Sequence, residues 1–334
     1  EKSDLETYSV AWRKPVRGTY RGWEIASMPP PSSGGLTVIQ MLMMLERWPV
    51  GEWGHNSAKT LHTMIEAMRL AYADRALYMA DNDFVPMPLK GLLDPAYVKS
   101  RADLIEPDGA AIPTVVAGTP PGPWEGGAGA TATAASAAEA SEESGETTHF
   151  VVADRWGNVV SWTTTIESAW GSGIMVPGYG FMLNNEMTDF DSGTTAANRI
   201  ETGKPKRPRS SMTPTILLKD GKPWMATGSP GGATIINTVL QVIMNVVDHG
   251  MTVQEAVDAP RISHTSASRT ASTSWETGIP ADVRTELTAR GHTLPTGSST
   301  IGSAQSLVID LQTGRMFGAG DAGRNGTVIY VKGG

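Results

Sequence analysis

Between residues 118 and 146 the composition changes abruptly, and this change divides the chain into two parts. The stretch consists mostly of Pro, Gly, Ala, Thr, Ser and Glu, and its centre reads Ala-Thr-Ala-Thr-Ala-Ala-Ser-Ala-Ala. Such a composition buries too little apolar surface to offset the entropy lost on ordering, so it predicts a flexible linker. The stretch ends directly at a β-favouring run that begins with Thr147. We therefore expect two parts, residues 1–146 and 147–334, which meet at this linker.

The first part is expected to be mainly helical. Residues 34–47 and 57–79 carry apolar side chains at spacings of three and four, which is the period of a helix with a packed face. The methionines of these segments are interpreted as core residues rather than as ligands, because a flexible thioether fills irregular gaps.

The second part is expected to open with a β-hairpin. Residues 147–153 and 159–165 favour strands, and the sequence Asp-Arg-Trp-Gly-Asn between them favours a turn. If all of these turn residues form the loop, Thr147 lies directly opposite Thr165. A two-residue shift of the register would leave two other candidates for that position, Thr163 and Glu167.

The remaining elements of the second part indicate more antiparallel strands and one long helix. We expect a hairpin of residues 213–218 and 224–227 around a loop at 219–222, a helix over 235–248, and strands near 306–310, 316–319 and 328–331. Helices grouped in one part and hairpins in the other favour an α+β fold, in which helices cover an antiparallel sheet, over alternating βαβ units.

Composition excludes several classes of function. The net charge of −7 argues against a nucleic-acid partner, and the one basic cluster, residues 204–209, is interpreted as a solvated loop rather than a binding patch. No apolar run approaches ~18 residues, so no membrane span is expected. The chain has no cysteine, and its six histidines show no i, i+4 pair, so no metal site is expected. The GxGxxG match at residues 318–323 lacks a following helix, so we expect no nucleotide and no other cofactor.

The junction at Thr147 has the properties that self-cleavage requires. A linker that delivers a hydroxyl residue to the start of a strand allows Thr147 to attack the carbonyl of Glu146. Hydrolysis of the resulting ester would leave Thr147 with a free α-amine, whose ordinary pKa of ~7.7 to 8.0 suits a general base. One residue would then supply both nucleophile and base. Taken alone, the same pattern also fits an ordinary boundary between a loop and a strand.

A series of short motifs resembles the γ-glutamyltranspeptidase family of N-terminal-nucleophile hydrolases. In chain order the motifs are Tyr20-Arg21-Gly22, Met28-Pro29-Pro30-Pro31-Ser32-Ser33-Gly34-Gly35, Ala71-Tyr72-Ala73-Asp74-Arg75, Thr147-Thr148-His149, Asp154 to Asn158, Gly171-Ser172-Gly173, Leu183-Asn184-Asn185-Glu186-Met187, Ser210-Ser211-Met212-Thr213-Pro214-Thr215 and Gly228-Ser229-Pro230-Gly231-Gly232. They keep the order of the family over nearly the whole chain. Together they are specific, although a glycine pair alone would mean little.

The resemblance implies a catalytic role for four residues. Thr147 matches the catalytic threonine, and Thr165 matches the threonine that hydrogen-bonds to it, the same pair that the hairpin register predicts. Gly231 and Gly232 match the glycines whose backbone N–H groups form the oxyanion hole, a role that needs close approach of the backbone.

The resemblance also implies the residues that bind the substrate. Ser210 and Ser211 match the pair that holds the substrate α-carboxylate. Glu167, Glu186 and Asp189 match the positions that bind the α-amino group, where a buried cation would balance their charge. The alternative for these carboxylates is a solvated acidic surface.

By the same resemblance, the fold is expected to be an αββα sandwich that lacks a part. Family members carry a further segment before the position where this chain begins, which includes an arginine that binds the α-carboxylate. Residues 1–146 would be the C-terminal part of a large subunit, and residues 147–334 a small catalytic subunit that pairs with it as a heterodimer. The family implies a periplasmic or secreted enzyme.

Three functions remain open from the sequence. The first is transfer or hydrolysis of γ-glutamyl amides such as glutathione, with an amino acid, a peptide or water as acceptor. The second is hydrolysis of glutaryl amides, as in the related cephalosporin acylases. The short segment 190–207 contains no aromatic lid residue beyond Phe190, and it therefore predicts an open pocket that suits both of these substrate classes. The third is a non-catalytic binding module.

Overall fold

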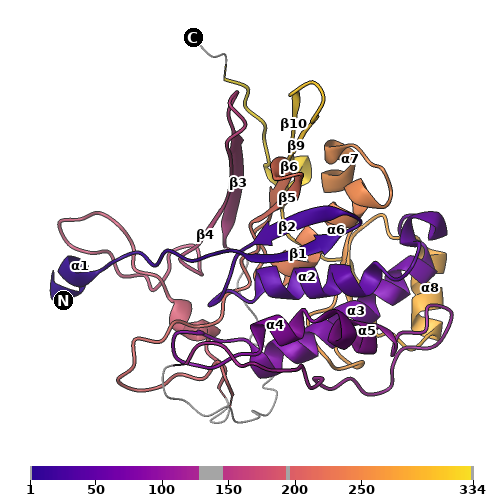
Figure 1. The fold of residues 1–334 in the computed structure, drawn as a ribbon, viewed down its shortest axis with the longest axis horizontal. Helices are drawn as coiled ribbons and strands as arrows, with labels where there is room; N and C mark the ends of the chain where they lie inside the picture. The colour runs from indigo at the N-terminus through magenta and orange to yellow at the C-terminus, as the bar shows by residue number, and fades with distance from the viewer. Residues whose placement is uncertain (1, 128–145, 193–195, 332–334) are drawn as a thin grey trace.

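A six-stranded antiparallel sheet forms the centre of the protein (Figure 1). The computed structural model describes residues 2–127, 146–192 and 196–331. In spatial order the strands are β1 (Val16–Tyr20), β2 (Trp23–Ser27), β5 (Thr215–Lys219), β6 (Lys222–Gly228), β9 (Gln305–Ile309) and β10 (Met316–Gly320). Both parts of the chain contribute strands to this sheet, and they meet where β2 pairs with β5. The two parts therefore share one sheet.

Three long helices lie on one side of the sheet, two of them against its strands and the third against one of these two helices. These are α2 (Gly34–Leu45), α3 (Ala58–Tyr78) and α6 (Thr234–Val247), and α2 contacts β1, β2, α3 and α6. The shorter elements are α1 (Lys2–Thr7), η1 (Val50–Trp53), α4 (Leu89–Leu92), α5 (Pro95–Ala102), η2 (Glu186–Asp189), α7 (Val253–Asp258), β7 (Ile262–Ser263), β8 (Ser274–Trp275), α8 (Ala281–Ala289) and η3 (Ala322–Arg324). None of the helices in the described ranges is long and apolar enough to cross a membrane.

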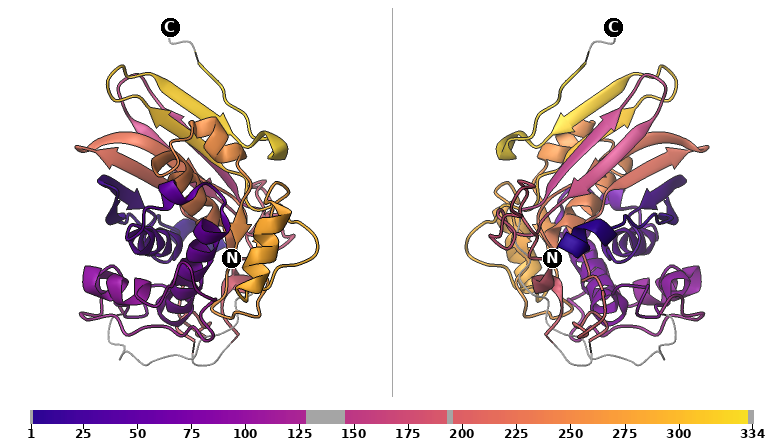
Figure 2. Two further views of the ribbon diagram at one scale, coloured as in Figure 1. Left: turned by 90° about the vertical axis from the view of Figure 1, so that its right-hand side faces the viewer. Right: turned by 90° about the vertical axis from the view of Figure 1, so that its left-hand side faces the viewer.

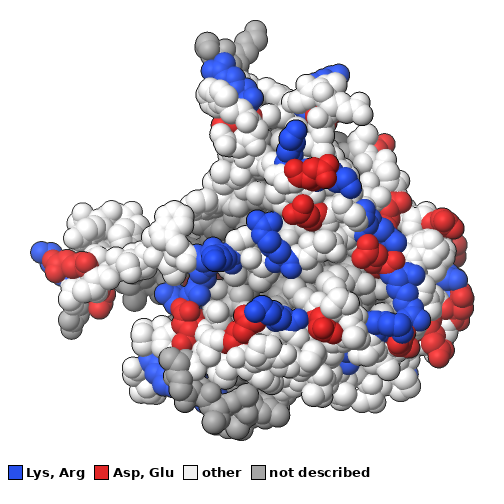
Figure 3. Space-filling view, in the orientation of Figure 1, with Lys and Arg blue, Asp and Glu red and all other residues white. Residues whose placement is uncertain are grey.

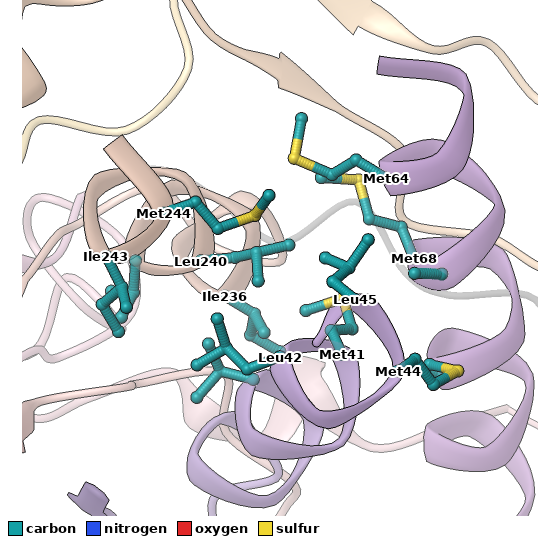
Figure 4. Close-up of a cluster of buried hydrophobic side chains, with 14 of the residues drawn as sticks. Met41, Leu42, Met44, Leu45, Met64, Met68, Ile236, Leu240, Ile243 and Met244 are labelled. Atoms are coloured by element: carbon teal, nitrogen blue, oxygen red, sulfur yellow. The ribbon is translucent and has the colours of Figure 1, made fainter. Parts of the chain in front are cut away.

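The main core lies between these helices and is rich in methionine (Figure 4). Met41 and Met44 of α2, together with Met68 of α3, are fully buried, and Met64 is 3% exposed. They pack with aliphatic residues of α6 such as Leu240. The interpretation of the methionines as core residues is therefore confirmed, and so are the two helices predicted at 34–47 and 57–79.

A second, two-stranded sheet lies on the other face of the large sheet. It is the hairpin of β3 (Thr148–Ala153) and β4 (Val159–Thr164), and Figure 2 shows it in magenta on the side away from the orange helices α6 and α7. The Ser161 hydroxyl donates to the Thr227 carbonyl of β6 at 3.1 Å, which ties the hairpin to the large sheet. The outer face of the hairpin is exposed, with Phe150 at 43% and Trp162 at 53%.

The predicted register of this hairpin is confirmed. Ala153 pairs with Val159 and Thr148 pairs with Thr164, so the five turn residues form the loop as expected. Thr147 and Thr165 are the next residues beyond the last pair on their strands.

Two predictions about strands need correction. The loop of the second hairpin is shorter than 219–222, because Lys219 pairs with Lys222 and only Asp220 and Gly221, both with positive φ, form the turn. Residues 328–331 form no strand, because the preceding residues 326–328 cross the face of β10 instead of running beside it. This crossing is close to the strand, since a Cβ added at Gly320 would lie 2.6 Å from the Thr327 nitrogen.

The hairpin β1–β2 was missed in a part of the chain expected to be mainly helical. Its pattern is weak, since Gly18 and polar residues interrupt the alternation and only Tyr20 and Ile25 are fully buried. Most of the predicted linker, residues 128–145, lies outside the described residues, and residues 118–127 contain no helix or strand beyond the isolated bridge of Met87 with Glu125.

The contact between the hairpin and the large sheet leads to a stability prediction for Gly228→Ala. A Cβ at Gly228 would lie 2.3 to 2.6 Å from three atoms of the buried His149 ring, and the ring is held by a 2.8 Å hydrogen bond between Nδ1 and the Thr163 hydroxyl. Because such overpacking forces backbone shifts, we expect a loss of about 1–3 kcal/mol in the free energy of unfolding.

Denaturant unfolding of the two proteins would measure this loss. Gly297→Ala is the matched control, because a Cβ there meets nothing within 4 Å. Equal stability of Gly228→Ala and Gly297→Ala would show that the two sheets are not in close contact at this point.

Candidate active site

A small pocket that opens to solvent lies where the hairpin begins. Its lining residues are Thr147, Thr165, Glu167, Glu186, Asp189, Ser210, Ser211, Met212, Gly232 and Ile235. The structure thus brings together eight of the residues singled out from the sequence. Of the other two, Gly231 precedes the lining residue Gly232, and Glu146 is exposed beside Thr147. Met212 and Ile235 were not expected in the lining.

Thr147 and Thr165 lie on the hairpin face that points toward the large sheet. Side chains alternate along a strand, so Thr147 shares a face with His149, and Thr165 with Thr163. The hydrogen bond between His149 and Thr163 at 2.8 Å marks that face as the one turned inward. Burial lowers the pKa of His149 to about 4, so this imidazole is neutral at pH 7.

The backbone at Glu167 is strained. Its φ of +74° is unusual for a residue with a side chain, and the residue is 8% exposed. The Thr165 hydroxyl accepts from the Glu167 N–H at 2.8 Å, while the carboxylate accepts from the hydroxyl of Ser168 at 2.6 Å and from the Asn185 amide. These contacts hold the carboxylate at the pocket wall and link it to the predicted partner of the nucleophile.

The other two carboxylates come from one helical turn. Glu186 and Asp189 are three residues apart in η2, so their side chains lie on the same side of the turn. Asn198, which is fully buried, donates to the Asp189 carbonyl at 2.7 Å and accepts from the Arg209 N–H at 2.7 Å. The buried amide of Asn198 therefore connects η2 with the backbone directly before Ser210.

Ser210 and Ser211 are held by residues from the other part of the chain. The backbone N–H and the hydroxyl of Ser33 both donate to the Ser210 carbonyl at 2.8 Å. Ser32 donates to the Met212 carbonyl at 2.7 Å, and Arg75 donates to the Ser211 hydroxyl at 2.6 Å. This wall of the pocket therefore depends on contacts across the predicted cleavage point.

Gly231 and Gly232 lie at the N-terminal end of α6. Their φ values are +132° and +55°, in the region that favours glycine, and a Cβ on Gly231 would come within 2.6 Å of the Thr234 hydroxyl. The end of a helix carries partial positive charge from its unpaired N–H groups, which favours a negative oxygen nearby. The Tyr72 hydroxyl fixes the following residue by donating to the Ala233 carbonyl at 2.6 Å.

Several residues that build the pocket were not singled out from the sequence. Tyr72, Arg75, Ser33 and Asn185 all lie within the motifs that carry the family resemblance, which was the one available signal. Asn198 lies in no motif, and its role follows only from its buried amide.

Residues 204–209 form no helix or strand, as predicted, but the prediction that the loop is solvated is wrong for Lys206 and Arg209, which are buried. The Lys206 amine donates to the carbonyls of Ala197 and Arg199, and Arg209 forms a buried ion pair with Asp191 at 3.0 Å. On the face shown in Figure 3, basic and acidic side chains are interspersed without a continuous basic area. Among the described residues, no group of three or more acidic or histidine side chains could hold a metal ion.

The helical layer, the two antiparallel sheets and a threonine directly before strand β3 form the fold of an N-terminal-nucleophile hydrolase. The chain belongs to the γ-glutamyltranspeptidase family, whose model matches residues 1–331.

The relatives include glutathione hydrolases and acylases. The glutathione hydrolase proenzyme of Bacillus subtilis (strain 168) is 46% identical over 330 residues, which are 99% of this chain and 55% of the relative. The acylase ACY 1 proenzyme of Pseudomonas sp. (strain SE83) is 36% identical over 334 residues, 100% of this chain and 55% of the relative. Cephalosporin acylase from Bacillus halodurans superposes with a TM-score of 0.83 at 27% identity, over 100% of this chain and 56% of that structure. The chain thus spans about half the length of the curated relatives it matches.

Proposed function

We propose that this chain forms the catalytic part of an enzyme that transfers or hydrolyses γ-glutamyl groups of amides such as glutathione, with Thr147 as nucleophile. The observation that supports this most directly is the pocket itself, which Thr147 lines together with three acidic residues and two serines. The name of the Bacillus subtilis relative supports the same substrate class.

The first reaction in this proposal is self-cleavage. The Thr147 hydroxyl attacks the carbonyl carbon of Glu146, and the peptide C–N bond breaks as an ester C–O bond forms. Water then hydrolyses the ester, which leaves a carboxylate on Glu146 and a free amine on Thr147. Glu146 is exposed, so water reaches this bond without a change of fold.

Turnover in the proposal reuses the same groups. The Thr147 α-amine takes the proton of the Thr147 hydroxyl as this oxygen attacks the γ-carbonyl, and it returns the proton to the leaving amine. The N–H groups of Gly231 and Gly232 stabilise the oxyanion that forms. Water or the amine of an amino acid or peptide then takes the γ-glutamyl group from Thr147.

We assign the two charged groups of the substrate to different lining residues of the pocket. Glu167, Glu186 and Asp189 bind the α-ammonium, because three carboxylates around one site need a cation to balance them. Ser210 and Ser211 donate to the α-carboxylate. A solvated acidic surface is the less favoured alternative, since Glu167 is only 8% exposed.

The first test is the site of cleavage. We expect the full natural polypeptide to yield a fragment whose N-terminal residue is Thr147, because that residue directly precedes strand β3. N-terminal sequencing and intact-mass measurement of the purified protein would establish the fragment. A fragment that begins at any other residue contradicts the mechanism, and a polypeptide that stays intact and does not react with γ-glutamyl anilides favours a binding module.

After cleavage, the two fragments are proposed to stay together as a heterodimer. Strand β2 of the first part pairs with β5 of the second along Glu24 to Ser27, so separation would break the large sheet. By the family resemblance, we also propose a periplasmic or secreted location.

Hydrolysis of glutaryl amides is the second candidate function. The acylase names of two relatives favour it, whereas the three carboxylates of the pocket disfavour it, because a glutaryl group has no ammonium.

A further inference from the structure

One face of α3 contacts two walls of the pocket from behind. Tyr72 and Arg75 are three residues apart in this helix, and both are 2% exposed. Tyr72 donates to the carbonyl of Ala233, next to the glycine pair, and Arg75 donates to the hydroxyl of Ser211. The guanidinium of Arg75 also lies over the Tyr72 ring, with its carbon 5.5 Å from the ring centroid.

Arg75 fixes the serine wall through two hydroxyls at once. Its Nε donates to the Ser33 hydroxyl at 2.8 Å, and its Nη2 donates to the Ser211 hydroxyl at 2.6 Å. Ser33 in turn donates to the Ser210 carbonyl at 2.8 Å. The planar guanidinium sets the directions of both bonds, which a lysine amine on a flexible chain would not do.

The contact with Arg75 also controls how Ser211 can donate. A hydroxyl has one proton, and an oxygen that accepts from Arg75 directs that proton away from the guanidinium. Hydrogen bonds in series polarise one another, so acceptance from a cation makes the hydroxyl a stronger donor to an anion. The positive charge of Arg75 lies buried behind the serine wall of the pocket. It attracts the same anion electrostatically.

We propose that Arg75 is a positioning residue for the substrate α-carboxylate and acts through Ser211. It sets the direction of the Ser211 hydroxyl and supplies positive charge behind it. This inference rests on the proposed function, because it needs a substrate with an α-carboxylate at the serine pair.

A purely structural role for Arg75 predicts a different result. If Arg75 only held α3 against the serine wall, its replacement would impair every substrate to the same degree. If it acts on the carboxylate, the loss depends on whether the substrate has one.

Two substrates separate these cases. γ-Glutamyl-p-nitroanilide carries the ammonium and the carboxylate, whereas 4-aminobutyryl-p-nitroanilide keeps the ammonium and the chain length but lacks the carboxylate. For Arg75→Gln we expect roughly a ten- to a hundredfold loss in kcat/KM on the first substrate, mostly as a higher KM. On the second we expect a change of less than about threefold, because no charge-assisted bond is lost there. Arg75→Lys keeps the positive charge but not the planar guanidinium with its fixed donor directions. Its kcat/KM on the first substrate should therefore lie between those of wild type and Arg75→Gln.

Tyr72→Phe is the matched comparison on the same helix face. It removes only the hydroxyl that donates to Ala233, beside the glycine pair that serves every substrate. We therefore expect it to lower kcat on both anilides by similar factors, in contrast to the selective effect at Arg75.

A double-mutant cycle keeps the inference testable if Arg75→Gln folds poorly. Ser211→Ala removes the hydroxyl through which Arg75 acts, so Arg75→Lys should add little to it on γ-glutamyl-p-nitroanilide. Equal losses on both anilides at Arg75, or full additivity with Ser211→Ala, would overturn the inference and leave the proposed function intact. A wild-type protein that fails to turn over γ-glutamyl-p-nitroanilide would overturn the proposed function itself.

Discussion

Thr147→Ala is expected to abolish both self-cleavage and turnover. Alanine has no oxygen to attack the Glu146 carbonyl, so neither the ester nor the free N-terminal amine can form. Because Thr147 is proposed as both nucleophile and base, we expect turnover to fall on the order of a thousandfold or more. Thr147→Ser should retain part of both reactions, since its hydroxyl and amine remain. Gel analysis over time and initial rates with γ-glutamyl-p-nitroanilide would measure the two effects.

The neighbouring residue offers a matched control for this experiment. Thr148 is exposed, and its side chain points away from the face that Thr147 shares with His149. Thr148→Ala should therefore be cleaved and should turn over substrate at close to wild-type rates. If Thr147→Ala still cleaves itself at the normal rate, another residue is the nucleophile.

A preference for γ-glutamyl over glutaryl amides is the second large effect that we expect. The two acyl groups have nearly the same size, but only the γ-glutamyl group carries an ammonium. Without it, Glu167, Glu186 and Asp189 lose their charge-assisted partner, which typically costs ~1.5 to 3 kcal/mol. We therefore expect roughly a ten- to a hundredfold preference in kcat/KM, measured by competition between the matched p-nitroanilides.

Asp189→Asn tests whether this preference comes from the pocket. It should shrink the preference, because it removes one negative charge beside the ammonium. Asp282→Asn removes an exposed carboxylate in the first turn of α8 and should leave the preference unchanged. Equal rates on the two wild-type substrates, or a preference for glutaryl, would move the enzyme into the acylase class.

The local elements of the fold could be predicted because their patterns are strong. The helices α2, α3 and α6 and the register of β3 with β4 follow from the periodicity of apolar residues and the length of one turn. The β1–β2 hairpin could not be predicted in the same way, because its stability comes from pairing with β5, about two hundred residues away along the chain.

The residues that line the candidate site could be predicted, but the residues that hold them in place could not. The motifs indicated which side chains to consider, and eight of them line one pocket. The contact of Arg75 with Ser211 spans 136 positions in sequence, and that of Tyr72 with Ala233 spans 161. No local pattern encodes such contacts, and the positive φ of Glu167 likewise depends on the surrounding fold.

The serine wall of the pocket, built from both sides of the junction at Thr147, has a thermodynamic consequence. If the protein is cleaved at Thr147 as proposed, Ser33 and Arg75 belong to one fragment, while Ser210 and Ser211 belong to the other. A ligand that needs this wall binds the associated pair better than either separated fragment. Binding of such a ligand and association of the fragments are therefore coupled. Association raises the affinity for the ligand, and the bound ligand raises the affinity between the fragments by the same factor.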